Sequence, residues 1–135
     1  MILEFEKKGE EFGRVIHQNP SLEFIYQCFE KWNLRYHSFF ILTCEDGSYV
    51  QTAGTKKRLI IEYRTMIADY FKQYTLGLDI EDKSETYINY SSGKIFLKQN
   101  EVLRLENVLE VFDSFYHTQR IPEKYLLREL DENYF

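Results

Sequence analysis

Cysteine, proline and tryptophan are scarce in this chain of 135 residues, which contains two, two and one of them. Cys28 and Cys44 belong to no CxxC or Cys/His pattern, which favours two buried, reduced thiols over a disulfide framework. No apolar run approaches the ~18 residues of a membrane-spanning helix, and the N-terminal residues do not read as a signal peptide. We therefore expect a cytoplasmic protein without membrane contacts.

Motifs that carry chemistry are also missing. His17, His37 and His117 are far apart, and none has a second ligand at metal spacing such as HExxH. The serines lack the GxSxG context of an activated nucleophile, and the six glycines do not gather into a phosphate-binding loop. The sequence does not exclude a pair of catalytic carboxylates, because any acidic chain offers many candidate pairs. The sequence therefore predicts no metal, no cofactor and no enzymatic activity, with a small hydrolase as an alternative.

Positive charge is in deficit. The chain has 17 Lys and Arg against 22 Asp and Glu, which gives a net charge of −5. Nucleic acid binding rests on Lys and Arg that neutralise phosphates, so this balance disfavours a nucleic acid partner. An acidic surface instead suits a basic protein partner, although it also serves ordinary solubility.

The length fits one domain, residues 1–135, with a sizeable core of its own. We expect a helix from Asn19, its cap, to about residue 33, with Pro20 in the first helical position. A second helix should begin at a cap on Asn100, with Glu101 in its first turn, and end before Ile121-Pro122. The expected strands lie between these helices and before the first: 2–5, 14–17, 38–44, 49–53, 58–65, 85–90 and 94–98.

Two segments are less regular. Residues 66–76 satisfy both an alternating and a helical apolar pattern, and we interpret them as a strand. Residues 125–130 are expected to form a short element that packs a C-terminal tail. The sum predicts an α+β fold, with an antiparallel meander sheet of five or six strands and two main helices packed on one face.

Polar residues interrupt the apolar strands in the middle of the chain. Glu62 and Arg64 share one strand face, because side chains alternate with a period of two, and Gln51 lies on the neighbouring strand. Such a cluster can be a partner-binding site or an internal network that fixes strand register. We predict a structural polar network for Glu62 and Arg64, and we keep Gln51 as a partner-binding candidate.

An acidic run follows the segment 66–76, and it includes two apolar or aromatic side chains, Ile80 and Tyr87. It can be a solvated loop, as most charge runs are, or a finger that imitates an acidic substrate and enters a basic cleft. The carboxylates that we propose for partner binding are Asp79, Glu81, Asp82 and Glu85.

Several short motifs occur in a characteristic order: Asn19-Pro20-Ser21, Tyr49-x-Gln51 to Gly54, Leu59-Ile-Ile-Glu62-Tyr63-Arg64, and Phe115-Tyr116-His-Thr-Gln-Arg-Ile-Pro122. Over about residues 14–130 the chain resembles small immunity proteins of bacterial polymorphic toxin systems, or contact-dependent growth inhibition systems. The closest similarity is to the group found beside deaminase and nuclease toxins.

The resemblance implies an antidote that binds the C-terminal domain of its cognate toxin and blocks the active site or the substrate cleft. Nucleic acid and membranes would not be partners, and the protein would be a monomer or weak dimer. Tyrosine is a favoured interface anchor, and the anchor candidates are Tyr70, Tyr74, Tyr87 and Tyr90. An interaction or adaptor domain without a toxin partner is the main alternative.

Overall fold

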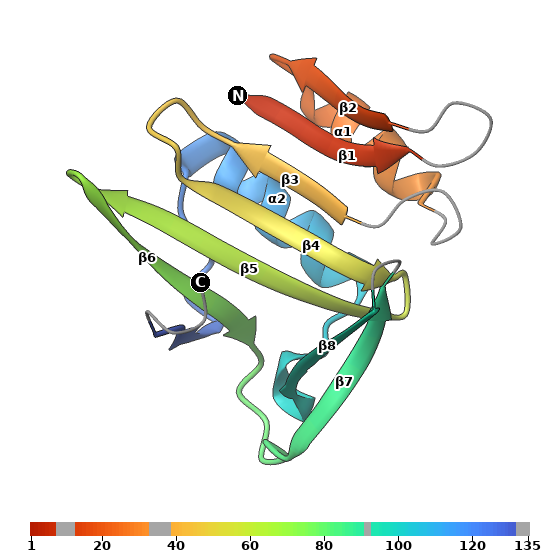
Figure 1. Cartoon of the computed structure of the whole chain (residues 1–135), viewed down its shortest axis with the longest axis vertical. Coiled ribbons are helices and arrows are strands. Elements are labelled where there is room, and N and C mark those ends of the chain that lie inside the picture. The colour runs from red at the N-terminus through yellow and green to blue at the C-terminus, as the bar shows by residue number, and fades with distance from the viewer. Residues whose placement is uncertain (8–12, 33–38, 91–92, 132–135) are drawn as a thin grey trace.

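The main sheet is antiparallel and is covered by helices on one face only. The computed structural model describes residues 1–7, 13–32, 39–90 and 93–131 (Figure 1). Among these residues, seven strands follow the order β2-β1-β3-β4-β5-β6-β9. Both helices, α1 (Leu22–Glu30) and α2 (Leu105–Thr118), lie behind the sheet in Figure 1. The strands are β1 (Ile2–Lys7), β2 (Gly13–Gln18), β3 (Phe39–Thr43), β4 (Tyr49–Thr55), β5 (Arg58–Ile67), β6 (Tyr70–Gly77) and β9 (Leu126–Glu129). The α+β prediction is confirmed, and the sheet is larger than expected.

The hairpin of β7 (Glu85–Tyr90) and β8 (Gly93–Lys98) forms a second, two-stranded sheet. Its strands were predicted correctly, but its place in one continuous meander was wrong. Ile88 and Leu97 are buried against Ala53 and Ile60 on the helix-free face of the main sheet. The inward face of the hairpin is therefore apolar because it covers one end of that open face.

The last strand pairs with β6 instead of packing a tail. Leu76 lies opposite Leu127 and Gly77 opposite Leu126, which makes β9 the edge of the sheet. The partner of a strand so late in the chain depends on long-range pairing, which a local pattern does not encode.

Residues 66–76 contain a turn that the sequence did not predict. β6 is a strand, as expected, but Met66 and Ile67 complete β5. Ala68 and Asp69 form the turn between them, and Ala68 has a positive φ of 55°. Tight hairpin turns usually place Gly, Asn or Asp at such a position. Because alanine stands at this position, the sequence carried no sign of the turn.

Both helices begin later than expected. Ser21 is the cap of α1, since its hydroxyl accepts the amide of Phe24, whereas Asn19 has a φ of 50° and donates its amide to Met1. The predicted cap residue Asn100 lies in a single turn of 3-10 helix, η1 (Gln99–Glu101), and α2 starts after Arg104. The predicted cap was therefore wrong for both helices: Ser21 takes the place of Asn19 at the start of α1, and Arg104 begins α2 without a side-chain cap hydrogen bond.

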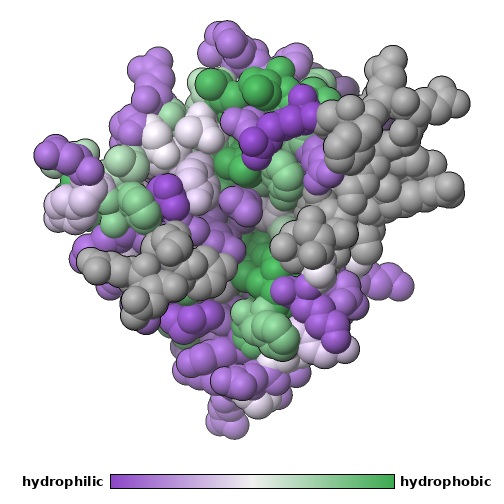
Figure 2. Space-filling model, in the orientation of Figure 1, coloured by the Kyte–Doolittle hydropathy of each residue, from purple (hydrophilic) through white to green (hydrophobic). Residues whose placement is uncertain are grey.

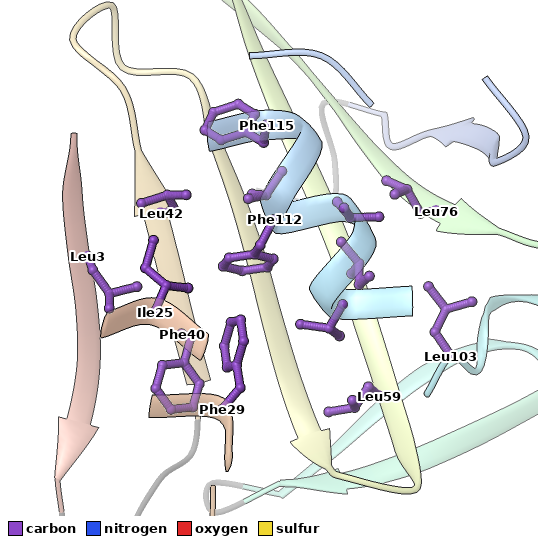
Figure 3. Close-up of a cluster of buried hydrophobic side chains, with 14 of the residues drawn as sticks. Leu3, Ile25, Phe29, Phe40, Leu42, Leu59, Leu76, Leu103, Phe112 and Phe115 are labelled. Carbon is purple, nitrogen blue, oxygen red and sulfur yellow. The ribbon is translucent and has the colours of Figure 1, made fainter. Parts of the chain in front are cut away.

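The core lies between the helices and the covered face of the sheet (Figure 3). Phe29 of α1 meets Phe112 of α2 and Phe40 of β3 edge to face, with ring centroids 4.9 and 5.0 Å apart. Leu3, Leu42 and other strand side chains complete this layer. Fully burying each such side chain contributes roughly 1.5–3 kcal/mol, so the core fixes the sheet on which the remaining features are built.

Candidate partner-binding surface

A closed polar network lies on the open face of the sheet. Gln73 connects it: its Nε2 donates to Oε2 of Glu62 at 2.7 Å, and its Oε1 accepts from Nε of Arg64 at 2.8 Å. The hydroxyl of Tyr49 donates to the same Oε1 at 3.1 Å. The guanidinium of Arg64 also lies 3.7 Å from the ring centroid of Phe71. The network therefore joins strands β4, β5 and β6.

The central side chains of this network are buried, although they lie on the open face of the sheet. Glu62 and Gln73 are buried, and a buried carboxylate is tolerated only when hydrogen bonds compensate its lost hydration. Gln73 thus joins Glu62 and Arg64 by hydrogen bonds, and their structural role stays a prediction. Gln51 lies directly opposite Glu62 and is half-buried. Gln73 was not singled out in the sequence, because only the register of β5 against β6 places it between the two charges.

The acidic loop, residues 78–84, is held at both ends. At its start, the amide of Leu78 donates to the carbonyl of Asn100 at 2.7 Å, and Nδ2 of Asn100 donates to the carbonyl of Leu78 at 3.1 Å. At its end, the amide of Gln99 donates to the carbonyl of Ser84 at 2.8 Å. The loop is therefore a braced connection between β6 and β7.

The four predicted carboxylates, Asp79, Glu81, Asp82 and Glu85, are all exposed. Asp82 accepts hydrogen bonds from the hydroxyl of Ser84 at 2.6 Å and from its amide at 3.0 Å. These bonds hold the pKa of Asp82 below its ordinary value, the hydroxyl having the larger effect. The carboxylate is thus charged at neutral pH, and its loop conformation is locally ordered.

Two aromatic rings lie on the outward face of the adjoining hairpin. Tyr87 of β7 is 43% exposed and Phe96 of β8 is 76% exposed, and the ring centroids lie 6.3 Å apart. The Nζ of Lys94 lies 4.4 Å from the centroid of the Tyr87 ring. We call the acidic loop together with β7 and β8 the acidic hairpin. Phe96 was missed in the sequence, where it resembles an ordinary core residue of a strand.

Two of the other tyrosine candidates, Tyr70 and Tyr74, do not join this surface. Tyr70 is exposed at the turn between β5 and β6, at the opposite end of β6 from the acidic loop (Figure 1). Tyr74 is half-buried and stacks on Tyr63, with the two ring centroids 6.1 Å apart. The side chain of Tyr90 lies outside the described residues, as does that of His37. Among the candidate tyrosines whose side chains are described, Tyr87 is thus the one that lies with the predicted acidic residues.

The open face also carries apolar side chains. Figure 2 shows them as a green band between hydrophilic flanks, in the same orientation as Figure 1. Ile2 of β1 and Ile16 of β2 are exposed there, while Ile41 of β3 is half-buried. The hairpin packs against Ala53, Ile60 and Phe39, so the band and the hairpin meet on β3.

The described residues give few groups that could react with a substrate. A pocket of about 610 Å³ is lined by Met1, Cys44, Asp46 and Tyr116, among others. Burial and a hydrogen bond to Asp46 raise the pKa of the Cys44 thiol, and burial raises that of Cys28. Both cysteines are unbridged and half-buried, more exposed than expected. A protonated thiol is a poor nucleophile.

Within the described ranges, no group of three His, Cys, Asp or Glu side chains is arranged to hold a metal ion. The helices described there are too short and too polar to cross a lipid bilayer. Comparison with known proteins adds no identity: no protein-family model matches the chain, and no curated protein matches it significantly.

Proposed function

We propose that this chain is an immunity protein, which binds a toxin domain that acts on nucleic acid and neutralises it by covering its active site or substrate cleft. The observation that supports this function best is the acidic hairpin. It presents exposed carboxylates and exposed apolar rings on one projecting, braced element. The resemblance of the sequence motifs to immunity proteins supports the same function.

The charge of the acidic hairpin suits such a partner. A nuclease or a nucleic acid deaminase attracts a polyanion, so its substrate cleft carries positive potential. Carboxylates at Asp79, Glu81 and Asp82 would then be drawn to the same cleft. Complementary charge of this kind raises the rate of encounter more than the affinity.

The affinity would come from the apolar anchors. Interfaces derive most of their binding energy from a few aromatic or apolar side chains that become fully desolvated. Ile80, Tyr87 and Phe96 supply three exposed candidates on the acidic hairpin. Because the loop is already pinned through Leu78 and Ser84, little conformational entropy would be lost on binding.

Co-expression tests this function. The chain is produced in bacteria together with the toxin domain encoded by the neighbouring open reading frame, and growth is scored. We expect growth to be restored by the chain and not by a variant with Asp79, Glu81 and Asp82 changed to Lys. Persistent killing in the presence of folded, soluble chain would contradict the proposal. Stable binding to a protein that is not toxic would favour the adaptor alternative.

A further inference from the structure

Strand β2 forms one edge of the main sheet (Figure 1). Just after this strand, the amide of Asn19 donates to the carbonyl of Met1 beside β1 at 2.8 Å. The backbone groups of successive residues point alternately to the two sides of a strand, and the register of β2 against β1 is unbroken. Every second residue before Asn19 therefore turns its N–H and C=O groups away from β1. These residues are Gln18, Ile16 and Arg14.

The outward groups have no hydrogen-bond partner in the part of the chain that the structure describes. Such a row of N–H and C=O groups is a template for another strand. No proline or bulge interrupts it. The Arg14 side chain lies over the sheet, where its Nε is 3.0 Å from Oε2 of Glu4 and its guanidinium carbon is 5.2 Å from the centroid of the Phe39 ring. Ile16, in the middle of the row, is 57% exposed.

Two other strand edges carry features that discourage pairing. β9, at the opposite edge of the main sheet, has four residues, and two of them are the charged residues Arg128 and Glu129. On β7, the carbonyl of Tyr87 accepts a hydrogen bond from Nη2 of Arg58 at 3.0 Å. An added strand would have to displace that bond. Shortness, charge and blocked backbone groups are usual protection for strand edges, and β2 has none of them.

We infer that β2 pairs with β2 of a second copy of the chain, antiparallel, about a two-fold axis that passes through Ile16 perpendicular to the sheet. Ile16 then lies opposite Ile16 of the second copy, and Arg14 lies opposite Gln18. Because these three residues carry the outward groups, each opposed pair exchanges two hydrogen bonds. Every outward N–H and C=O group of the edge finds a partner, and the two sheets become one.

The side chains of β2 suit pairing with themselves. An isologous interface requires a surface that is complementary to itself. The exposed Ile16 side chains meet each other, and Arg14 faces the neutral Gln18, so no like charges are opposed. An axis through Val15 would place Arg14 opposite Ile16 and move Gln18 beyond the end of the described strand. The axis through Ile16 is therefore the register that uses the whole edge.

The dimer is independent of the proposed toxin. The acidic hairpin packs against Phe39, Ala53 and Ile60 on β3, β4 and β5, so pairing at β2 leaves it exposed. One strand pair buries less than the roughly 1,200–2,000 Å² of a stable interface, so the dimer is weak and reversible. Each copy has a net charge of −5. Salt should strengthen the association, because it screens the repulsion between two acidic molecules.

Sedimentation velocity of the full chain over a range of concentrations and salt tests the dimer. Ile16→Pro removes an N–H group that points outward and none that bonds β1, so it should weaken self-association at least tenfold. Ile16→Lys should have a similar effect. Ile80→Lys is the matched control, since Ile80 is 46% exposed on the acidic loop, and it should associate like wild type. Thermal melting verifies that each variant is folded.

Disulfide trapping tests the register. Hydrogen-bonded antiparallel pairs place their Cα atoms about 5.5 Å apart, which is within the range of a disulfide. Ile16→Cys should cross-link with itself, whereas Arg14→Cys and Gln18→Cys should cross-link with each other and not with themselves. The wild-type chain, with Cys28 and Cys44, gives the background.

Three results would overturn the inference: a wild-type chain that stays monomeric at the highest concentration reached, dimers that are indifferent to Ile16→Pro, or Arg14→Cys that cross-links with itself above background. A monomeric wild type would leave the edge to a strand of another protein. Growth rescue is a separate readout, because monomeric Ile16→Pro should still neutralise the toxin. Failure of the dimer and failure of the proposed function are thus distinguishable.

Discussion

Arg128 of β9 holds the buried carboxylate of Glu101 with two parallel hydrogen bonds. Its Nε lies 2.8 Å from Oε2 and its Nη2 lies 2.9 Å from Oε1 of Glu101. The backbone amide of Lys98 donates to the same Oε1 at 2.9 Å. This pair fastens the edge strand to η1, whose residues also hold both ends of the acidic loop. The edge strand β9 and the acidic loop are therefore both held to η1 by hydrogen bonds.

The first prediction concerns this pair. Arg128→Met should lower the free energy of unfolding by about 2–4 kcal/mol, because it leaves a buried carboxylate without its cation. Chemical denaturation measures the loss. The double variant Arg128→Met with Glu101→Gln should regain part of it, since no buried charge is then left uncompensated. Equal midpoints for wild type and Arg128→Met would contradict this prediction and show that the Glu101 carboxylate does not need Arg128.

The second prediction separates folding from binding on the open face. Glu62→Ala removes the acceptor of the buried Gln73 amide, which should cost about 1–3 kcal/mol of stability. Toxin affinity at a temperature where the variant is folded should stay within twofold of wild type. Gln51→Ala, directly opposite on β4, is the matched control with a smaller expected effect. Normal melting with lost protection would reverse the role that we give to Glu62.

The third prediction concerns the rate of association. Changing Asp79, Glu81 and Asp82 to Lys should slow association with the toxin at least tenfold at low salt and weaken its salt dependence. Stopped-flow mixing measures both effects. Reversal of Glu30, Glu45 and Glu123, which are exposed elsewhere, changes the net charge equally. If both triple variants associate at the same rate, the acidic loop does not steer the encounter.

The fourth prediction uses a contact between the helices. Tyr26 of α1 donates its hydroxyl to Asp113 of α2, and burial together with this bond raises the pKa of Tyr26 to about 12. An unfolded tyrosine titrates near about 10, so the stabilisation is complete below about pH 10 and is lost as the pH rises through about 12. The stability difference between wild type and Tyr26→Phe should therefore shrink over that range. A constant difference up to about pH 12 would show that folding does not raise the pKa of Tyr26.

Local chemistry explains what could be predicted from the sequence. An Asp-Gly pair between two apolar runs is a hairpin signal, and Asp46-Gly47 lies between β3 and β4, where Gly47 has a φ of 93°. The alternating and helical apolar patterns located both helices, apart from their caps, and the other strands except β9, but they missed the turn between β5 and β6. The exposure of the acidic run was equally clear, because charged side chains rarely leave water without a partner.

Long-range pairing explains what could not be predicted. The position of β9 beside β6, and of the hairpin over Ala53 and Ile60, depends on partners that are distant along the chain. The same holds for Gln73, whose place between Glu62 and Arg64 follows from strand register alone. Phe96 has a strand pattern on its own, and only the packing of Ile88 and Leu97 shows that it faces solvent.

The affinity of aromatic variants for the purified toxin domain tests the proposed binding surface most directly. The double variant Tyr87→Ala with Phe96→Ala should bind at least a hundredfold more weakly in calorimetry, because it removes both central anchors while the inward face of the hairpin is kept. Ile67→Ala with Tyr70→Ala removes a similar exposed pair at the turn between β5 and β6 and should bind like wild type. Full affinity in the first variant and a large loss in the second would contradict the account and move the interface to the other end of β6.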